Sequence, residues 1–421
     1  MREVLQRRVR STELPFCAHA VGEEEIAEVA ATLGSAWITT GPKVKQFEED
    51  FSRFVGAPAA LAVNSCTAAL HLALVTLGVG PGHRVITSPM TFCASVNVIE
   101  HVGARPLLVD VEPDTLNIAP HQVEAALARA GRDARTQGQD GPIKAILPIH
   151  LHGHPYEMDA ILGLARDFHL DVIEDGAHAL GAAYRTRPVG SWAADAAVPR
   201  TLTCFSFYAT KNLTTAEGGM LTGAPSLVED ARPWSLHGMS RDAWKRYDAT
   251  GSWYYEVLHP GFKYNMTDVQ ASIGLHQLRK VPAFQGRRRA IVRRYTQAFS
   301  TFPEVDTPPE RPEVEHAWHL YALRLRTERL RFPGADTSAA AIRHRFIEEL
   351  RARKIGASVH FIPVHLHPYY RDKYGYRRED FPVAYREYQR LVSLPLFPRM
   401  SDDDVDDVVD AVADVLERYR R

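Results

Sequence analysis

The sequence is poor in cysteine and contains no long apolar run. Four cysteines occur among 421 residues, and none of them forms a CxxC pair: Cys17, Cys66, Cys93 and Cys204. This spacing argues against a disulfide framework and against cysteine metal sites, so we expect reduced thiols. No stretch is long enough to span a membrane, and the basic first residues lack the apolar segment of a signal peptide. We therefore expect a cytoplasmic protein with no membrane partner.

Neither sign of charge is in excess. Fifty basic residues stand against 51 acidic residues, which leaves a formal net charge of -1. A balanced chain has no general electrostatic attraction for a polyanion, so we expect no nucleic-acid partner, although a local site can still hold a small anion.

Short apolar runs alternate with helical patterns between residues 58 and 223. Near-continuous apolar strands are typical of a parallel sheet with helices on both faces, so the pattern predicts a mostly parallel α/β domain. The predicted strands are 59–63, 84–89, 106–111, 145–151, 171–175, 201–207 and 218–223. The polar, glycine-rich stretch 131–142 predicts an exposed loop.

The character of the chain changes after about residue 280, and its length already exceeds that of one hydrophobic core. The pattern predicts a smaller α+β C-terminal domain with helices over 283–299, 340–354 and 401–419, and strands over 319–326 and 356–363. We divide the chain into an N-terminal arm (1–20), a large domain (21–280) and a small C-terminal domain (281–421).

The segment FSFYATKNLTTAEGGML (205–221) places Lys211 between a predicted strand and a Gly-Gly pair that leads into the next strand. A buried lysine whose pKa is lowered by desolvation is the residue type that forms an imine with an aldehyde cofactor. Surface lysines are far more common than buried, imine-forming lysines, so this segment alone makes Lys211 only a candidate.

Three other segments bring complementary residues to the ends of predicted strands. Asp175 ends DVIED (171–175), where it can pair with a pyridinium nitrogen or cap the next helix. Ser65 and Thr67 in NSCTAALHLAL (64–74) open a helix, which favours a bound phosphate or simple capping. Phe92 in SPMTFCASVN (88–97) can stack on a planar ring or pack in the core. Together with Lys211, these segments predict a pyridoxal phosphate (PLP) site.

These segments resemble the sugar aminotransferases of the DegT/DnrJ/EryC1/StrS family, within fold type I (the aspartate aminotransferase superfamily) of PLP enzymes. The resemblance implies the PLP-dependent transferase fold type I, with a large, mostly parallel α/β domain and a smaller α+β C-terminal domain. It covers nearly the whole chain from about residue 38, and is also carried by ITTGPKVKQFEEDF (38–51), LPIHLHGHPYEMDAI, VIEDGAHALGA, PGFKYNMTDVQASIG (260–274) and VSLPLFPRMSDDD (392–404).

The resemblance also implies roles for individual residues. Lys211 would hold PLP as a Schiff base and shuttle protons, Asp175 would pair with the pyridine nitrogen, and His178 would lie near the ring's 3-hydroxyl group. Phe92 would stack on the ring. Phosphate contacts would come from Ser65, Cys66, Thr67 and Ser206. In a homodimer with shared sites, Asn265 would reach the phosphate of the partner, while Thr40 and His360 would lie near the substrate.

The reaction implied is the transfer of an amino group from L-glutamate to a nucleotide-linked keto-deoxysugar, giving an aminodeoxysugar nucleotide. Cys66 stands where glycine is common and His178 where glutamine is common, and the histidine favours 4-keto sugars. The alternatives are a keto-cyclitol aminotransferase, a PLP-dependent dehydratase, or a catalytically silent PLP-fold binding or regulatory protein. The presence of Lys211 disfavours a dehydratase, because in such relatives histidine replaces the lysine. It also disfavours a catalytically silent protein, which would have no reason to keep this lysine.

Three histidines alternate in HLHGHP (150–155), a spacing that would place them on one face of a strand. No carboxylate or cysteine partner lies nearby in the sequence, so we expect no metal site.

Overall fold

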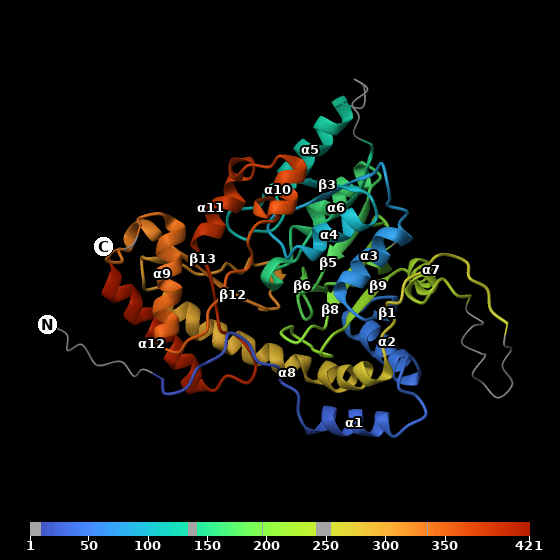
Figure 1. Ribbon diagram of the computed structural model, residues 1–421, viewed down its shortest axis with the longest axis horizontal. Helices are drawn as coiled ribbons and strands as arrows, with labels where there is room; N and C mark the ends of the chain where they lie inside the picture. Colours follow the sequence, from blue (N-terminus) through green and yellow to red (C-terminus); the bar gives the residue numbers. More distant parts are fainter. Residues whose placement is uncertain (1–9, 134–140, 196, 241–253, 335) are drawn as a thin grey trace.

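The structure is a computed structural model that describes residues 10–133, 141–195, 197–240, 254–334 and 336–421. A seven-stranded sheet lies at the centre of the large domain, in the order β1-β9-β8-β5-β4-β2-β3 (Figure 1). Within this sheet only β9 runs antiparallel to its neighbours, which confirms the predicted mostly parallel sheet. The strands are β1 (Ala59–Val63), β2 (Arg84–Thr87), β3 (Arg105–Leu108), β4 (Ile143–Leu147), β5 (Asp171–Asp175), β8 (Thr201–Ser206) and β9 (Gly219–Gly223).

Helices cover both faces of this sheet, which explains why its strands are apolar on both sides. One face packs against α3 (Cys66–Thr76), α4 (Ala94–His101) and α7 (Pro225–Ser235). The other face packs against α2 (Pro42–Val55), α5 (Pro120–Asp133), α6 (Met158–Asp167) and the first half of α8 (Asp268–Phe299). The sequence alternates accordingly along β5, where Ile173 faces α3 and Val172 faces α6.

A second, antiparallel sheet organises the C-terminal domain, in the order β10 (Val305–Asp306), β12 (Tyr321–Leu325) and β13 (Leu391–Leu394). Its core also contains side chains of α9 (Ala339–Ala352), α12 (Asp402–Tyr419) and the second half of α8. Because α8 is one helix of 32 residues, it connects the two domains, and the predicted boundary at residue 280 falls inside it. That division of the chain stays a prediction.

Smaller elements complete the described chain. A third sheet joins β6 (Ala183–Tyr184) to β7 (Arg187–Pro188) and to β11 (Val314–Glu315), and α1 (Glu23–Leu33) packs on α8. Helices α10 (Pro368–Tyr374) and α11 (Pro382–Arg390) lie between α9 and β13 in the chain. None of the helices in the described ranges is long and apolar enough to cross a bilayer.

Two local predictions differ from the structure or fall outside it. The predicted strand 356–363 forms only one bridge, in which Ser358 and Ser393 exchange backbone hydrogen bonds of 3.1 and 2.8 Å. Beyond Ser358 the chain leaves the sheet edge and directs His360 and Phe361 into a cavity, so its alternating pattern does not continue as a strand. Of the predicted loop 131–142, residues 134–140 lie outside the described residues, and residues 131–133 end α5.

Candidate active site

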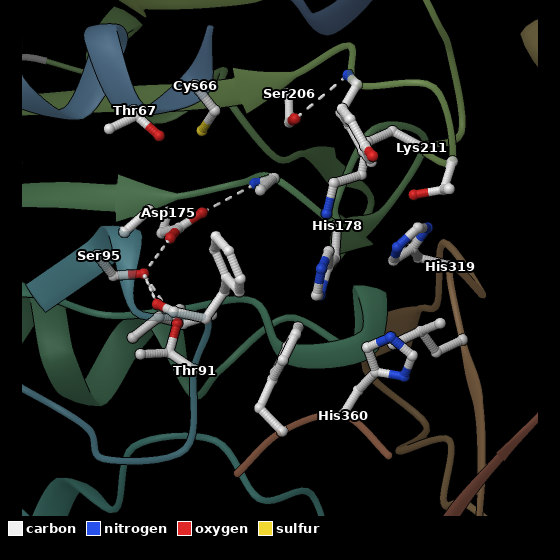
Figure 2. A pocket seen from close by; sticks show the side chains of 18 of the residues that line it. Cys66, Thr67, Thr91, Ser95, Asp175, His178, Ser206, Lys211, His319 and His360 are labelled. Atoms are coloured by element: carbon white, nitrogen blue, oxygen red, sulfur yellow. Dashed lines mark hydrogen bonds between the residues drawn. The ribbon is translucent and has the colours of Figure 1, made fainter. Parts of the chain in front are cut away.

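A cavity of about 530 Å³ lies at the carboxyl ends of the parallel strands, between the large and the small domain. In an open α/β sheet, this edge is where ligands bind. Figure 2 shows Asp175, Ser95 and Thr91 on one side of the cavity, and Lys211, His178 and His319 on the other. The structure thus brings together side chains that lie far apart in the sequence.

Lys211 lies in the turn after β8, where its backbone N–H donates to the carbonyl of Tyr208 at 2.9 Å. Its side chain lines the cavity, as the sequence predicts for an imine-forming lysine. Burial lowers the pKa of Lys211 to about 8, although the nearby Asp175 carboxylate acts to raise it. Near neutral pH, the amine of Lys211 is therefore neutral far more often than that of an ordinary lysine. The neutral amine can act as a nucleophile or a base.

Asp175 is the last residue of β5, and its carboxylate is held by two hydrogen bonds. The Ser95 hydroxyl donates to it at 2.6 Å and the Ala177 backbone N–H donates at 3.0 Å. Ser95 Oγ lies 2.8 Å from Thr91 Oγ1, and since Ser95 donates to the carboxylate, Thr91 donates to Ser95. Two donors on one carboxylate fix its direction. A carboxylate held in this way can pair with a protonated ring nitrogen.

Ser95 and Thr91 were not predicted as site residues from the sequence, although both lie in SPMTFCASVN (88–97), the segment from which Phe92 was predicted. Their signal is two hydroxyl side chains in the segment that follows a predicted strand, because Thr91 precedes α4 (Ala94–His101) and Ser95 lies in its first turn. The carboxylate partner cannot be read from the segment itself.

The N-terminus of α3 lies at the same cavity. Ser65 caps the helix by accepting a hydrogen bond from the Ala68 N–H at 3.1 Å, while the first-turn N–H groups of Cys66 and Thr67 have no helical acceptor. Gly219 of β9 packs so tightly here that a Cβ would lie 2.5 Å from the Ser65 carbonyl carbon. Ser206, the last residue of β8, adds a hydroxyl to the cavity wall. This set of donors suits an anion such as a phosphate.

The side chain of Cys66, the first residue of α3, lines the cavity. Burial raises the pKa of the Cys66 thiol well above its ordinary value. The group is therefore a neutral thiol beside the α3 N-terminus, and it adds no negative charge that would repel a phosphate.

Aromatic rings form another wall of the cavity. Phe92 is 60% exposed and its ring centroid lies 6.0 Å from that of Phe361. Phe361 in turn stacks on His178, with centroids 5.7 Å apart and an interplanar angle of 16°. Phe92 is therefore a cavity aromatic and not a core aromatic, which leaves its face free for a planar ligand ring.

His178 is held in one tautomer by the backbone. Its Nδ1 accepts a hydrogen bond from the His152 N–H at 3.2 Å, so in the neutral ring the proton is on Nε2. Burial lowers the pKa of His178 well below its ordinary value, and the nearby Lys211 lowers it further. His178 therefore presents a neutral Nε2–H donor.

None of the three histidines of HLHGHP lines this cavity, and the segment turns as a short 3-10 helix (Leu151–Gly153) and is not a strand. His150 is completely buried, 3.4 Å from Glu174 on the opposite face of β5. His154 approaches the Pro155 carbonyl at 2.7 Å. Among the residues that the structure describes, no cluster of three or more histidine, cysteine or acidic side chains could hold a metal ion.

His360 lines the cavity from the small domain, whereas Thr40 and Asn265 do not line it. The Asn265 amide donates to Thr40 Oγ1 at 2.7 Å, and Thr40 donates to the Met266 carbonyl at 2.6 Å. Asp268 holds the same turn by accepting N–H groups of Gly41, Lys43 and Val44. Thr40 and Asn265 therefore form one unit outside the cavity of their own chain.

The N-terminal arm also reaches the cavity, which the sequence did not predict. Phe16 and Cys17 line it, and the Phe16 ring stacks on His360 with centroids 5.1 Å apart. The arm is tied to the small domain by Leu14, which hydrogen-bonds the backbone of Lys354 and Gly356. Nothing in the local sequence of residues 10–18 indicates this contact.

Comparisons with known proteins agree with this geometry. The chain matches the DegT/DnrJ/EryC1/StrS aminotransferase family over residues 19–413. It is 49% identical over 410 residues to the spore coat polysaccharide biosynthesis protein SpsC of Bacillus subtilis (strain 168), covering 97% of this chain and 98% of that protein. It is 48% identical over 413 residues to the uncharacterized protein MJ1066 of Methanocaldococcus jannaschii, covering 98% and 100%.

A solved structure is similar along almost its whole length. Spr1654 of Streptococcus pneumoniae, a proposed sugar aminotransferase solved in its PLP form, superposes with a TM-score of 0.82 at 34% identity, covering 96% of this chain and 99% of that chain. A PMP form of Spr1654 gives the same TM-score.

The fold is therefore the type I fold of PLP-dependent transferases. Within that class, the chain belongs to the DegT/DnrJ/EryC1/StrS family of PLP-dependent sugar aminotransferases.

Proposed function

We propose that this enzyme transfers the amino group of L-glutamate to a nucleotide-linked keto-deoxysugar, with a 4-keto sugar favoured, and produces an aminodeoxysugar nucleotide. The observation that carries the proposal is the pairing of Lys211, with a pKa of about 8, and the hydrogen-bonded Asp175 carboxylate in one cavity. The name of the relative SpsC, a polysaccharide biosynthesis protein, supports a sugar substrate.

The cavity residues fit pyridoxal phosphate as the cofactor. Lys211 would hold its aldehyde carbon, and Asp175 would pair with its ring nitrogen. Phe92 would stack on the ring and the His178 Nε2–H would donate to the ring oxygen. Its phosphate would be bound at the N-terminus of α3 by the four residues Ser65, Cys66, Thr67 and Ser206. The bound cofactor supplies an aldehyde that takes up the amino group and a ring that delocalises negative charge.

The protein's own groups then control proton movement. The amine of Lys211 lines the same cavity as His178 and Asp175, and its lowered pKa lets Nζ both accept and return a proton near neutral pH. The thiol of Cys66 stays protonated and does not compete as a nucleophile. In the complete reaction L-glutamate becomes 2-oxoglutarate, and the ketone carbon of the sugar gains the amino group and a hydrogen.

We further propose a homodimer that shares its sites, with Asn265 of the partner subunit reaching the phosphate and Thr40 lying near the substrate. The Thr40–Asn265 pair lies outside the cavity of its own chain, and Ile38, two residues before Thr40, is 54% exposed. Exposed apolar side chains near a functional residue favour a partner surface.

Mixed dimers test this arrangement. Equal amounts of Lys211→Ala and Asn265→Ala protein are unfolded, refolded together and assayed. If Asn265 acts on the partner's site, half of the dimers carry one intact site, and about a quarter of all sites are active. If Asn265 acts within its own chain, no intact site forms and the mixture stays inactive.

Substrate assays test the reaction itself. Purified holoenzyme is incubated with L-glutamate or L-glutamine and with UDP-, dTDP- or GDP-linked keto sugars or scyllo-inosose, and the products are identified by mass spectrometry. Amination of a nucleotide keto sugar with release of 2-oxoglutarate is expected. Amination of scyllo-inosose alone would assign a keto-cyclitol aminotransferase. No amination of any acceptor by PLP-loaded enzyme would contradict the proposal.

A further inference from the structure

We infer that His319 is a further binding residue of this site, held by Asn212 so that its unprotonated Nε2 faces the cavity and accepts a hydrogen bond from an N–H or O–H donor. Two groups carry such a donor: the Lys211 amine and a hydroxyl of the sugar. The inference deepens the proposed function and rests on it for the sugar hydroxyl, but the state of the ring rests on this chain alone.

The side-chain amide of Asn212 has a fixed orientation. Its Nδ2 donates to the Ala317 carbonyl at 2.9 Å and to the Leu180 carbonyl at 3.3 Å. A carbonyl oxygen can only accept, so the Asn212 nitrogen must face these two groups. Its Oδ1 consequently faces the remaining neighbour, the ring of His319.

This orientation sets the tautomer of His319. Its Nδ1 lies 3.1 Å from Asn212 Oδ1, and because that oxygen can only accept, Nδ1 must carry a proton. In the neutral ring, Nε2 is then left with a lone pair. Burial lowers the pKa of His319 well below its ordinary value, with further lowering from His178 and Lys211, so the neutral ring predominates.

The Nε2 atom of His319 opens to the cavity. His319 is a cavity-lining residue, and the described residues offer its Nε2 no hydrogen-bond partner. Nε2 is also not one of the enclosed side-chain atoms that lack a hydrogen-bond partner, a set that includes both ring nitrogens of His365. Its lone pair is therefore accessible to a group inside the cavity.

His178 and His319 form a complementary pair. Their ring centroids lie 4.3 Å apart, and both line the same cavity beside Lys211 (Figure 2). His178 has its proton on Nε2, because Nδ1 accepts the His152 N–H, whereas His319 has its proton on Nδ1. The His178 ring therefore offers a hydrogen-bond donor to the cavity, and the neighbouring His319 ring offers an acceptor. Two histidines whose tautomers were not fixed by neighbouring groups would not impose this pattern.

Asn212 acts here as a positioning residue. It directly follows Lys211 in the chain, and its three contacts join the lysine turn to the loop after β5 and to the segment before β12. The buried guanidinium of Arg288 supports the same segment by donating to the carbonyls of Trp318, His319 and Leu396. The ring of His319 is thus fixed from both sides before any ligand enters.

Nitrogen NMR of histidine-labelled, PLP-loaded protein tests the tautomer directly, with signals assigned by His319→Gln and His178→Gln. The expected result is a protonated Nδ1 and an unprotonated Nε2 for His319, and the reverse for His178, between pH 6 and 8. A protonated Nε2 or an imidazolium for His319 would overturn the inference. This readout does not depend on which sugar is the substrate, so it also holds if the proposed reaction fails.

Two variants test the acceptor. His319→Asn can keep the contact to Asn212 but loses a group at Nε2, whereas His319→Gln can place its amide oxygen there. We expect His319→Asn to reduce kcat/KM by at least about tenfold and His319→Gln to restore part of that loss. His344→Gln, in an exposed position on α9, is the matched control with unchanged kinetics.

The same variants separate the two donors. If the donor is Lys211, His319→Asn shifts the pH dependence of the rate at which cofactor-free protein takes up PLP. If the donor is a sugar hydroxyl, that profile is unchanged and the KM for the sugar rises. Identical behaviour of His319→Asn and His344→Gln in both measurements would overturn the acceptor role.

Discussion

The two sides of the cavity are built differently. On the sheet side, Asp175, Ser206 and the start of α3 lie at the ends of strands whose backbone hydrogen bonds fix their positions. On the small-domain side, Phe16, His360 and Phe361 come from irregular segments, and their rings pack on one another. The sheet side offers a carboxylate, an amine and hydrogen-bond donors besides Phe92 and His178, whereas the small-domain side offers imidazoles, aromatic rings and aliphatic side chains.

The two sides therefore suit different tasks: the sheet side suits cofactor binding and catalysis, and the small-domain side suits substrate selectivity. A cofactor common to a whole class needs the rigid donors of the sheet side, whereas a substrate that differs between relatives suits the irregular side. We therefore expect substitutions on the sheet side to reduce turnover, and substitutions on the small-domain side to change mainly the KM for the sugar.

The largest effect is expected for Lys211→Ala. This variant removes the amine with a pKa of about 8 that holds the cofactor and moves protons, so kcat should fall by more than about 10³-fold. The visible absorbance of the PLP-loaded protein should also disappear, while circular dichroism stays that of a folded protein. Turnover within a few-fold of the unsubstituted enzyme would remove Lys211 from the mechanism.

Asp175→Asn should reduce kcat by about 10²-fold or more, because an amide cannot stabilise a protonated ring nitrogen as a carboxylate does. Asp171→Asn is the matched control at the other end of β5, where Asp171 pairs with Arg200 at 2.7 Å. Steady-state kinetics should show a large kcat effect for the first variant and none for the second. Equal effects would mean that Asp175 acts only through the stability of the strand.

Acid should destabilise the protein through its buried histidines. Burial lowers the pKa of His152 to about 4 and of His360 to about 3, from an ordinary value of 6.5. Below 6.5 the unfolded chain binds protons that the folded chain excludes, so stability falls as the pH falls from 6.5 towards 4. Each such histidine contributes about 1.4 kcal/mol per pH unit.

Urea unfolding of cofactor-free protein at several pH values checks this slope. The variant His152→Gln should unfold with a shallower pH dependence, and the exposed control His344→Gln should keep the original slope. A stability that stays constant between pH 6.5 and 4.5 would show that these histidines are already protonated in the folded protein.

Ser95→Ala should have a smaller effect, a loss of about tenfold in kcat, because one charge-assisted hydrogen bond to Asp175 disappears. Ser95→Thr keeps a hydroxyl and should restore part of the activity. If Ser95→Ala leaves kcat unchanged, the Ala177 N–H alone orients the carboxylate.

Phe16→Ala is expected to be the mildest change. It removes the ring that stacks on His360, so the KM for the sugar should rise by roughly three- to tenfold with kcat nearly constant. Phe168→Ala, an exposed position next to α6, is the control. A loss in kcat without a change in KM would contradict the division of roles between the two sides.

The sequence predicts the sheet side better than the small-domain side for a physical reason. Apolar runs indicate strands, and residues that follow parallel strands meet at one sheet edge, so Lys211, Asp175 and Ser65 could be grouped before the structure was known. Phe16 reaches the cavity through long-range packing that no local pattern records.

The tautomers of His178 and His319 depend on hydrogen bonds from residues that are distant in the sequence, and only the structure provides these. The predicted strand 356–363 fails for a related reason: its alternation of apolar and polar residues continues after the backbone has left the sheet. The domain division at residue 280 and the roles of Thr40 and Asn265 remain predictions.

The most direct test of the central claim is to trap the cofactor on the protein. The PLP-loaded enzyme is reduced with borohydride, digested and mapped by mass spectrometry. The account predicts one phosphopyridoxyl group, carried by the peptide that contains Lys211. A group on another lysine, or none at all, would contradict it.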